Sequence, residues 1–236
     1  MSRKDELTKG YENPASKFLE WKSSDKAFVY WDKDKKENVV IPLPLKLVFL
    51  KDFNTIKGYS KKHDAGVWAN EVADLRKEKL SVGIFENGKV KKLFTGYYDD
   101  IKDKLALMNG AKFSKSVYAM TPKGTIINLQ LFGSGLGNFF ELDKRKLFNH
   151  FLEIADIKEG KNGGVVFYRP VFKIGDEIPD DVIEKSEFAY EKVKEYYNAY
   201  KKQYQDEQPQ PVKKEQPDIN DDLPQLDSLL SDDLPF

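Results

Sequence analysis

Short segments rich in β-branched and aromatic residues run through most of this 236-residue chain. Segments of this kind are typical of β-strands, whose side chains alternate between two faces. The Asn-Gly pair at 87–88 indicates a tight hairpin, and residues 121–125 indicate a second turn. The strand-like segments are 26–31, 45–50, 80–86, 89–98, 115–121, 125–132 and 164–174. They predict a small antiparallel β structure.

Helical patterns interrupt the strands at 64–79, at 98–110, where Gly110 ends the pattern, and at 138–155. A further helix is expected at 179–204, with Asp180 or Asp181 as its cap and a tyrosine-rich apolar stripe that packs on the body. Strands and helices do not alternate, which argues against a doubly wound α/β sheet. The pattern predicts a mainly β fold with inserted helices (α+β). An OB-fold-like antiparallel barrel is the first choice, and an SH3-like barrel or an irregular α+β sheet fits nearly as well.

The composition changes sharply at Gln205. The remaining residues are rich in proline, glutamine and acidic side chains and contain one aromatic residue. Such a segment buries too little apolar surface to offset the entropy of ordering, so we expect a disordered tail. This divides the chain into a body at 1–178, the helix at 179–204, a Pro/Gln linker at 205–217 and an acidic tail at 218–236.

The overall net charge of zero conceals an asymmetry. Nine of the 39 acidic residues but only two of the 39 basic residues lie in 206–236, which gives −7 there and +7 for residues 1–205. A basic body joined to an acidic tail suggests a polyanionic partner.

Several classes of function are disfavoured. The chain has no cysteine, which excludes disulfides and thiolate chemistry. Its two histidines, His63 and His150, lie in separate segments, so we expect no metal site, no cofactor and no enzymatic activity. Residues 133–138 (GSGLGN) lack the third glycine of a dinucleotide-binding motif, and we expect the glycines to turn the chain and Asn138 to cap a helix. The N-terminus has no secretory signal and no apolar run is long enough to span a membrane, which predicts a cytoplasmic protein.

Aromatic and basic residues are interleaved in the middle of the chain. Single-stranded nucleic acid is held by a positive groove and by aromatic faces on which bases stack. A binding surface of this kind is predicted to include Phe53, Lys57, Tyr59, Lys61, Lys62, Trp68, Phe85, Lys89, Lys91, Lys92, Phe94, Tyr97, Lys112, Phe113, Lys115 and Tyr118.

Alternation assigns faces to two of the predicted strands. In 80–86, Leu80, Val82 and Ile84 are expected to face the core, which leaves Ser81, Gly83 and Phe85 on the outer face, where Gly83 beside Phe85 is expected to form a flat shelf for a base. In 125–132, the residues expected to point inward are Ile127, Leu129 and Leu131, and those expected to point outward are Asn128, Gln130 and Phe132.

The last five residues are Asp232, Asp233, Leu234, Pro235 and Phe236. This tip resembles the acidic Asp-Asp-Asp-Ile-Pro-Phe end of bacterial and phage single-stranded DNA-binding proteins, the SSB family. Ser231 stands where that family usually has a third aspartate, and Leu234 replaces isoleucine. The resemblance covers the tip and the order of basic body, linker and acidic end, but not the sequence of the body.

The resemblance implies a divergent SSB, encoded by a bacterium or a phage. Such a protein coats single-stranded DNA in replication, recombination or repair, and it recruits replication or repair proteins through its tip. A terminal phenylalanine with its carboxylate also suits an apolar pocket rimmed by basic residues. An RNA-binding or annealing protein, or a scaffold whose body binds no nucleic acid, is an alternative. The sequence leaves the oligomeric state open, a homo-oligomer included.

Overall fold

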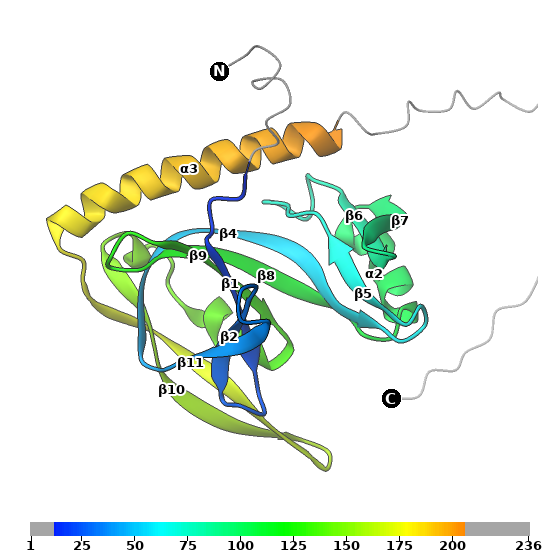
Figure 1. The fold of residues 1–236 in the computed structure, drawn as a ribbon, viewed down its shortest axis with the longest axis horizontal. Coiled ribbons are helices and arrows are strands. Elements are labelled where there is room, and N and C mark those ends of the chain that lie inside the picture. Colours follow the sequence, from blue (N-terminus) through cyan, green and yellow to red (C-terminus); the bar gives the residue numbers. More distant parts are fainter. Residues whose placement is uncertain (1–11, 206–236) are drawn as a thin grey trace, which may run out of the picture.

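The computed structural model describes residues 12–205, with side chains to residue 202, and shows a mostly β body with a long C-terminal helix (Figure 1). The strands are β1 (Lys17–Lys22), β2 (Ala27–Asp32), β3 (Glu37–Ile41), β4 (Leu45–Ser60), β5 (Ala65–Ala69), β6 (Leu80–Glu86), β7 (Lys89–Gly96), β8 (Ala111–Met120), β9 (Ile126–Phe132), β10 (His150–Asn162) and β11 (Val165–Glu177). The helices are α2 (Tyr98–Leu107) and α3 (Asp180–Gln205), and the 3-10 turns are η1 (Gly133–Leu136), η2 (Phe139–Glu141) and η3 (Lys146–Phe148).

All the described strands belong to one sheet, in the order β3-β2-β1-β9-β8-β4-β5-β6-β7, and β10 pairs with β4 and with β11. The pairs are antiparallel except β1 with β9, which is parallel. The long strand β4 pairs with β10 through Leu45–Leu47 and with β8 through Val48–Gly58. The mainly β fold and the C-terminal helix are confirmed. The sheet is not closed into a barrel, so the expected OB-type barrel is not confirmed.

Side chains, rather than another strand, occupy the outer edge of β11. Asn138 binds both the N–H and the C=O group of Phe172, at 2.7 and 2.9 Å. Further along the edge, the Tyr168 N–H donates to Ser23 Oγ and its C=O accepts from Trp21 Nε1. A strand edge covered in this way is satisfied without a partner strand, which leaves the sheet open at this point.

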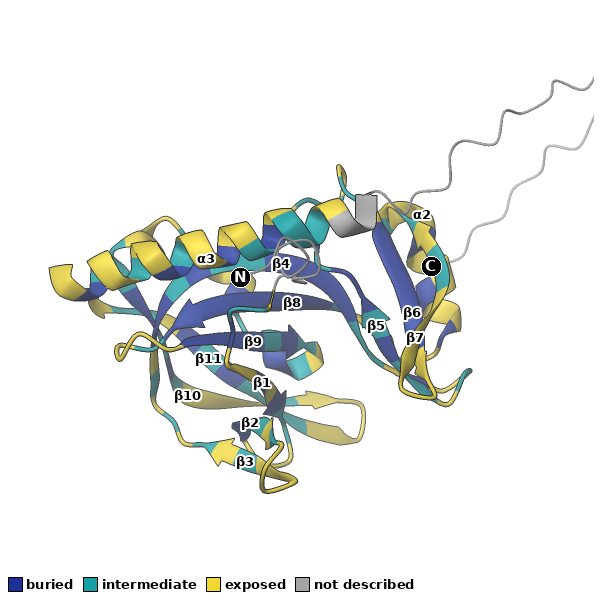
Figure 2. Ribbon diagram, turned by 45° about the horizontal axis from the view of Figure 1, so that its top comes forward, coloured by how far each residue is buried: buried dark blue, intermediate teal, exposed yellow. Residues whose placement is uncertain are grey.

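Three apolar clusters hold the fold together. One fills the space between β1, β8 and β9 and the β10–β11 pair, around Phe139 and Phe172. A second lies between α3 and the opposite face of β4 and β8, where Val193 of the helix is fully buried. Figure 2 shows this arrangement, with the helix buried along one side and exposed along the other. The third is the core of the lobe formed by β5, β6, β7 and α2.

Two of the predicted helices are wrong. Within 64–79 the chain forms β5 followed by a turn, and Val67 and Ala69 point into the core of the lobe. Residues 138–155 form η2, η3 and the start of β10. In 64–79 the apolar residues Ala65, Ala69, Val72 and Leu75 recur at three- to four-residue steps in the sequence, but β5 buries Val67 and Ala69 at the two-residue spacing of a strand. The helix at 98–110 is confirmed in α2, and no helix among the described residues is long and apolar enough to cross a membrane.

Candidate nucleic-acid interface

The outer face of the lobe brings together several of the predicted residues. Tyr59 of β4 is paired with Gly66 of β5, and Phe85 of β6 is paired with Val90 of β7. The β5–β6 register places Phe85 beside Gly66, where a Cβ atom would lie 3.4 Å from the Phe85 ring. Tyr59 and Phe85 are 52% and 50% exposed. The two rings therefore flank a glycine in one row across the sheet, and we call this surface the lobe face.

A second row of the lobe face consists of Trp68, Gly83 and Lys92 on neighbouring strands. The expected shelf at Gly83 does not form. A Cβ atom at Gly83 would lie 2.5 Å from the carbonyl oxygen of Lys91 and 3.0 Å from Val90, because the β6–β7 pair is bulged here. The glycine that leaves room beside Phe85 is Gly66 instead, on a segment where the sequence predicted a helix.

Lysines at the ends of the lobe strands make this region basic. Lys61 and Lys62 are exposed in the β4–β5 turn, and Lys89 is exposed at the start of β7. Of the nearby carboxylates, Glu86 is paired with Lys91. Asp64 accepts a hydrogen bond from the Tyr59 hydroxyl, which raises the pKa of Tyr59 and orients its ring. The turns therefore offer ammonium groups around the exposed rings.

Lys57 and Lys112 form a second group, opposite each other on β4 and β8. Burial lowers the pKa of the half-buried Lys57, although the charges of Glu71 and Glu20 partly offset this effect. Glu71 accepts hydrogen bonds from Ser116 and Tyr118, and burial raises the pKa of its carboxyl. Lys57 therefore faces carboxylates, whereas Lys112 is exposed.

A third group lies where the lobe meets the body. Phe113 packs against Phe140 of η2, with ring centroids 6.2 Å apart, and Phe140 is 56% exposed. Lys115 is buried, and its ammonium group lies 2.6 Å from Asp52, which also binds Lys144. Burial acts to raise the pKa of the Asp52 carboxyl, but the two ammonium groups outweigh it and lower this pKa. Lys115 is thus neutralised within the protein.

The remaining predicted residues do not share a surface. Phe53 and Tyr118 are completely buried beneath α3, and the Phe53 ring stacks on Tyr197 at 4.2 Å. Phe94 and Tyr97 lie beside α2, where their rings contact the ammonium groups of Lys104 and Lys79. Phe53 and Tyr118 therefore fill the core, and we leave them out of the interface. The predicted tail, including residues 232–236, lies outside the described residues.

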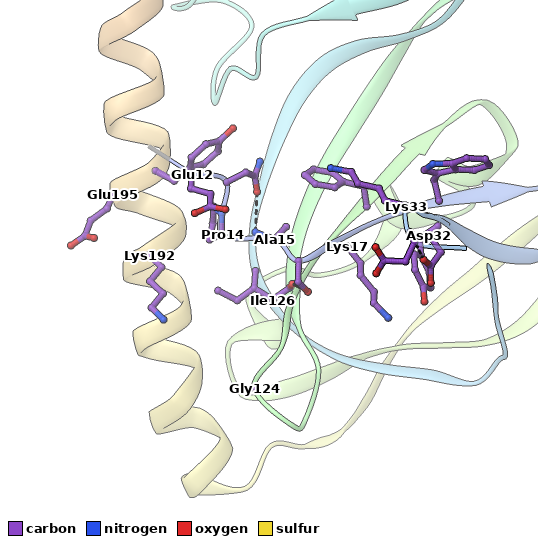
Figure 3. Close-up of a pocket in the computed structure, with 17 residues that line it drawn as sticks. Glu12, Pro14, Ala15, Lys17, Asp32, Lys33, Gly124, Ile126, Lys192 and Glu195 are labelled. Carbon is purple, nitrogen blue, oxygen red and sulfur yellow. Dashed lines mark hydrogen bonds between the residues drawn. The ribbon is translucent and has the colours of Figure 1, made fainter. Parts of the chain in front are cut away.

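Among the described residues, sequence reasoning missed five exposed aromatic residues: Phe18 on β1, Trp31 on β2, Phe140, Phe148 and Phe188. Phe18 and Trp31 line a groove of about 1200 Å³ between α3 and the β1–β2 pair (Figure 3). Lysines and carboxylates both line this groove: Glu12, Lys17, Asp32, Lys33, Asp34, Lys192 and Glu195. The mixed charge makes the groove less suited to a polyanion than the lobe face. Phe18 could have been suspected from the sequence, because it alternates with the polar residues Glu20 and Lys22 along β1, whereas Trp31 alternates with apolar Val29 and carries no such signal.

The geometry of the lobe face favours binding over catalysis. Two half-exposed rings in one row of a sheet, with lysines at the strand ends, can stack bases and attract phosphates. Within residues 12–205, no group of three or more histidine or acidic side chains is arranged to hold a metal ion. Comparison with models of protein families, with curated proteins and with solved structures found no match.

Proposed function

We propose that this protein is a non-enzymatic single-stranded DNA-binding protein that binds without sequence preference in replication, recombination or repair. The observation that carries the proposal is the row of the lobe face in which Tyr59 and Phe85 flank Gly66. Bases stack on the two rings, and the phosphates between them follow Lys61, Lys62 and Lys89. Stacking on protein aromatics tolerates any base, which accounts for binding without sequence preference.

The division of charge supports the same proposal. Residues 1–205 carry a net charge of +7, and the acidic end at 206–236 carries −7. The positive body attracts the strand, while the tip at 232–236, which resembles that of the SSB family, recruits replication or repair proteins. As part of this proposal, the protein acts in the cytoplasm of a bacterial cell or of a phage-infected host.

The connectivity of five strands supports a relation to the OB fold, which we also propose. In that fold a five-stranded Greek-key barrel is partly open. Here β4 pairs with β8 at one end and with β10 at the other, β8 pairs with β9, and β10 pairs with β11. The lobe is then an insertion between β4 and β8, and β1–β3 are additional strands beside β9.

The test is to titrate the protein with oligo(dT) and to monitor binding by the quenching of the protein's fluorescence. Stacking is worth about 1–3 kcal/mol per base, so Tyr59→Ala and Phe85→Ala should each weaken binding by about 5-fold to 150-fold. Both rings are half exposed, so neither change should unfold the body. The matched controls are Phe148→Ala and Phe188→Ala, whose rings are 74% and 71% exposed outside the lobe face, and they should bind as the wild type does.

The outcome that would refute the proposal is absence of salt-sensitive binding at low ionic strength, which would favour a scaffold whose body binds no nucleic acid. Competition between DNA and RNA oligomers of equal length separates the proposed function from an RNA-binding or annealing role. Incubation of labelled strands with magnesium would reveal a nuclease.

A further inference from the structure

The β10–β11 hairpin extends beyond the body as an arm, which we define as residues 156–169 (Figure 1). The body holds the arm on one side at Tyr168. The Tyr168 N–H group donates to Ser23 Oγ at 2.8 Å, and its carbonyl oxygen accepts from Trp21 Nε1 at 2.9 Å. The ammonium group of Lys26 lies 3.9 Å from the centre of the Tyr168 ring. The base of the arm is therefore fixed relative to β1 and β2.

The opposite side of the arm carries a different set of residues. Side chains alternate along a strand, so Phe167 and Arg169 point away from the side on which Tyr168 contacts the body. Lys158 lies directly opposite Arg169, and Gly160 lies directly opposite Phe167. A Cβ atom at Gly160 would lie 2.5 Å from the Phe167 ring, so the ring rests over the glycine backbone.

The Lys158–Arg169 pair is unfavourable for the hairpin by itself, because like charges directly opposite each other destabilise a sheet. Neither side chain forms an ion pair within residues 12–202. The acidic residue nearest to Lys158 on the same side of its strand is Asp156, and its carboxylate is paired with Lys173. Two positive charges thus lie together beside an aromatic ring, and among residues 12–202 neither is paired with a carboxylate.

We propose that this side of the arm is a second contact for single-stranded DNA, separate from the lobe face. Lys158 and Arg169 hold a backbone phosphate between them, and the Phe167 ring supports the adjoining sugar or base. The guanidinium group suits this role because its planar fork matches the oxygen atoms of a phosphate. The inference rests on the proposed function and extends the bound strand from the lobe to the arm.

Lys158→Glu tests the inference, because its effects on stability and on binding should have opposite signs. The new carboxylate would lie opposite Arg169 and replace a repulsion by an attraction, so the thermal midpoint should rise. Binding of oligo(dT) should weaken by about 10-fold at low salt. The slope of log affinity against log salt should also become shallower by about 1.4, as expected for two lost charge contacts to a single strand.

The matched control is Lys123→Glu, which makes the same change of charge at an exposed lysine in the β8–β9 turn. It should alter affinity and salt slope much less. If Lys158→Glu and Lys123→Glu bind equally well while Tyr59→Ala and Phe85→Ala bind weakly, the inference is wrong and the proposed function stands. If the wild type itself fails to bind oligo(dT), both are wrong.

Discussion

Gly137 shows how one backbone position joins distant parts of the body. Its φ is +50°, in the region that side-chain-bearing residues rarely adopt, and a Cβ atom there would lie 2.3 Å from the Pro170 carbonyl oxygen. The neighbouring Asn138 holds both backbone groups of Phe172, two residues further along β11. Gly137 is therefore required both for its conformation and for the close approach to β11.

Gly137→Ala should lower the free energy of unfolding by about 2–5 kcal/mol, the sum of the backbone cost and the forced contact. Gly163→Ala is the control, since Gly163 has a φ of +57° and no atom within 4 Å of the added Cβ. It should cost only the backbone part, about 1–2 kcal/mol. Urea unfolding measures both, and equal losses would show that β11 moves away from Gly137 at no cost.

The same segment shows what local sequence can and cannot predict at the residue scale. The glycines of 133–138 were expected to turn the chain, and Gly133 and Gly137 do have positive φ. Asn138 was expected to cap a helix, but its side chain binds Phe172, 34 residues away. Turn chemistry depends on neighbouring residues and is visible in the sequence. A hydrogen bond to a distant strand depends on the completed fold and is not.

At the scale of elements, Glu78 attaches the C-terminal half of α3 to the turn between β5 and β6. Its carboxylate accepts hydrogen bonds from the Tyr197 hydroxyl, the Lys201 ammonium group and the backbone N–H groups of Ala73 and Asp74. Burial acts to raise the pKa of Glu78, but these donors outweigh it and lower the pKa below its usual 4.5.

Glu78→Gln should therefore destabilise the protein by about 1.5–3 kcal/mol at pH 7, the usual worth of hydrogen bonds to a charged group. A carboxyl whose pKa is lowered by folding stabilises the fold above its unfolded-state pKa, and the stabilisation is lost as the pH falls through the folded-state pKa. The difference between wild type and variant should thus shrink below about pH 4.5. Chemical unfolding at several pH values measures it.

The control is Glu184→Gln, at an exposed position on α3, which should change stability by less than about 0.5 kcal/mol at any pH. A pH-independent loss in Glu78→Gln would show that the side chain acts through packing rather than charge.

Elements with a strong local pattern were predicted well, and those defined by tertiary contacts were not. The stripe of α3 and the hairpin at Asn87 are local features, and both are present. The sequence pattern did not predict strands at β1, β3, β5 or β10. In β10, Phe151 packs in the cluster beneath α3, whereas Leu152 and Ile154 pack in the cluster on the other face of the sheet. Both faces of the strand therefore carry apolar residues, and the sequence does not show the alternation of apolar and polar residues by which a strand is recognised. The candidate site could not be predicted fully for the same reason. Gly66 lies beside Phe85 only because β5 pairs with β6, and β5 was not predicted as a strand.

At the scale of the whole molecule, the lobe face and the arm are two separate surfaces on residues 1–205, whose net charge is +7. Lys61 and Lys62 are exposed at the lobe and contribute to attraction rather than to packing. Replacing both by alanine should leave the thermal midpoint unchanged. It should make the salt dependence of oligo(dT) binding shallower by about 1.4, at about 0.7 per lost phosphate contact. An unchanged slope would place the strand elsewhere on the body.

Truncation after Gln205 tests whether the body binds DNA while the tail binds partner proteins. It removes a net charge of −7 from a chain whose remaining part carries +7, so the attraction for a polyanion increases. The truncated chain should bind oligo(dT) as tightly as the full chain or more tightly. Any gain should be largest at low salt, because salt screens the interaction between separated charges. In pull-down experiments, the truncated chain should no longer capture replication or repair proteins.

The matched variant is deletion of Phe236 alone, which keeps every acidic side chain. It should abolish partner capture and leave the salt dependence of DNA binding as in the full chain, because the proposed function assigns the ring to the partner contact, whereas the acidic side chains set the charge. Weaker DNA binding by the truncated chain, or unfolding of its body, would contradict the proposed separation and make the tail part of the DNA-binding structure.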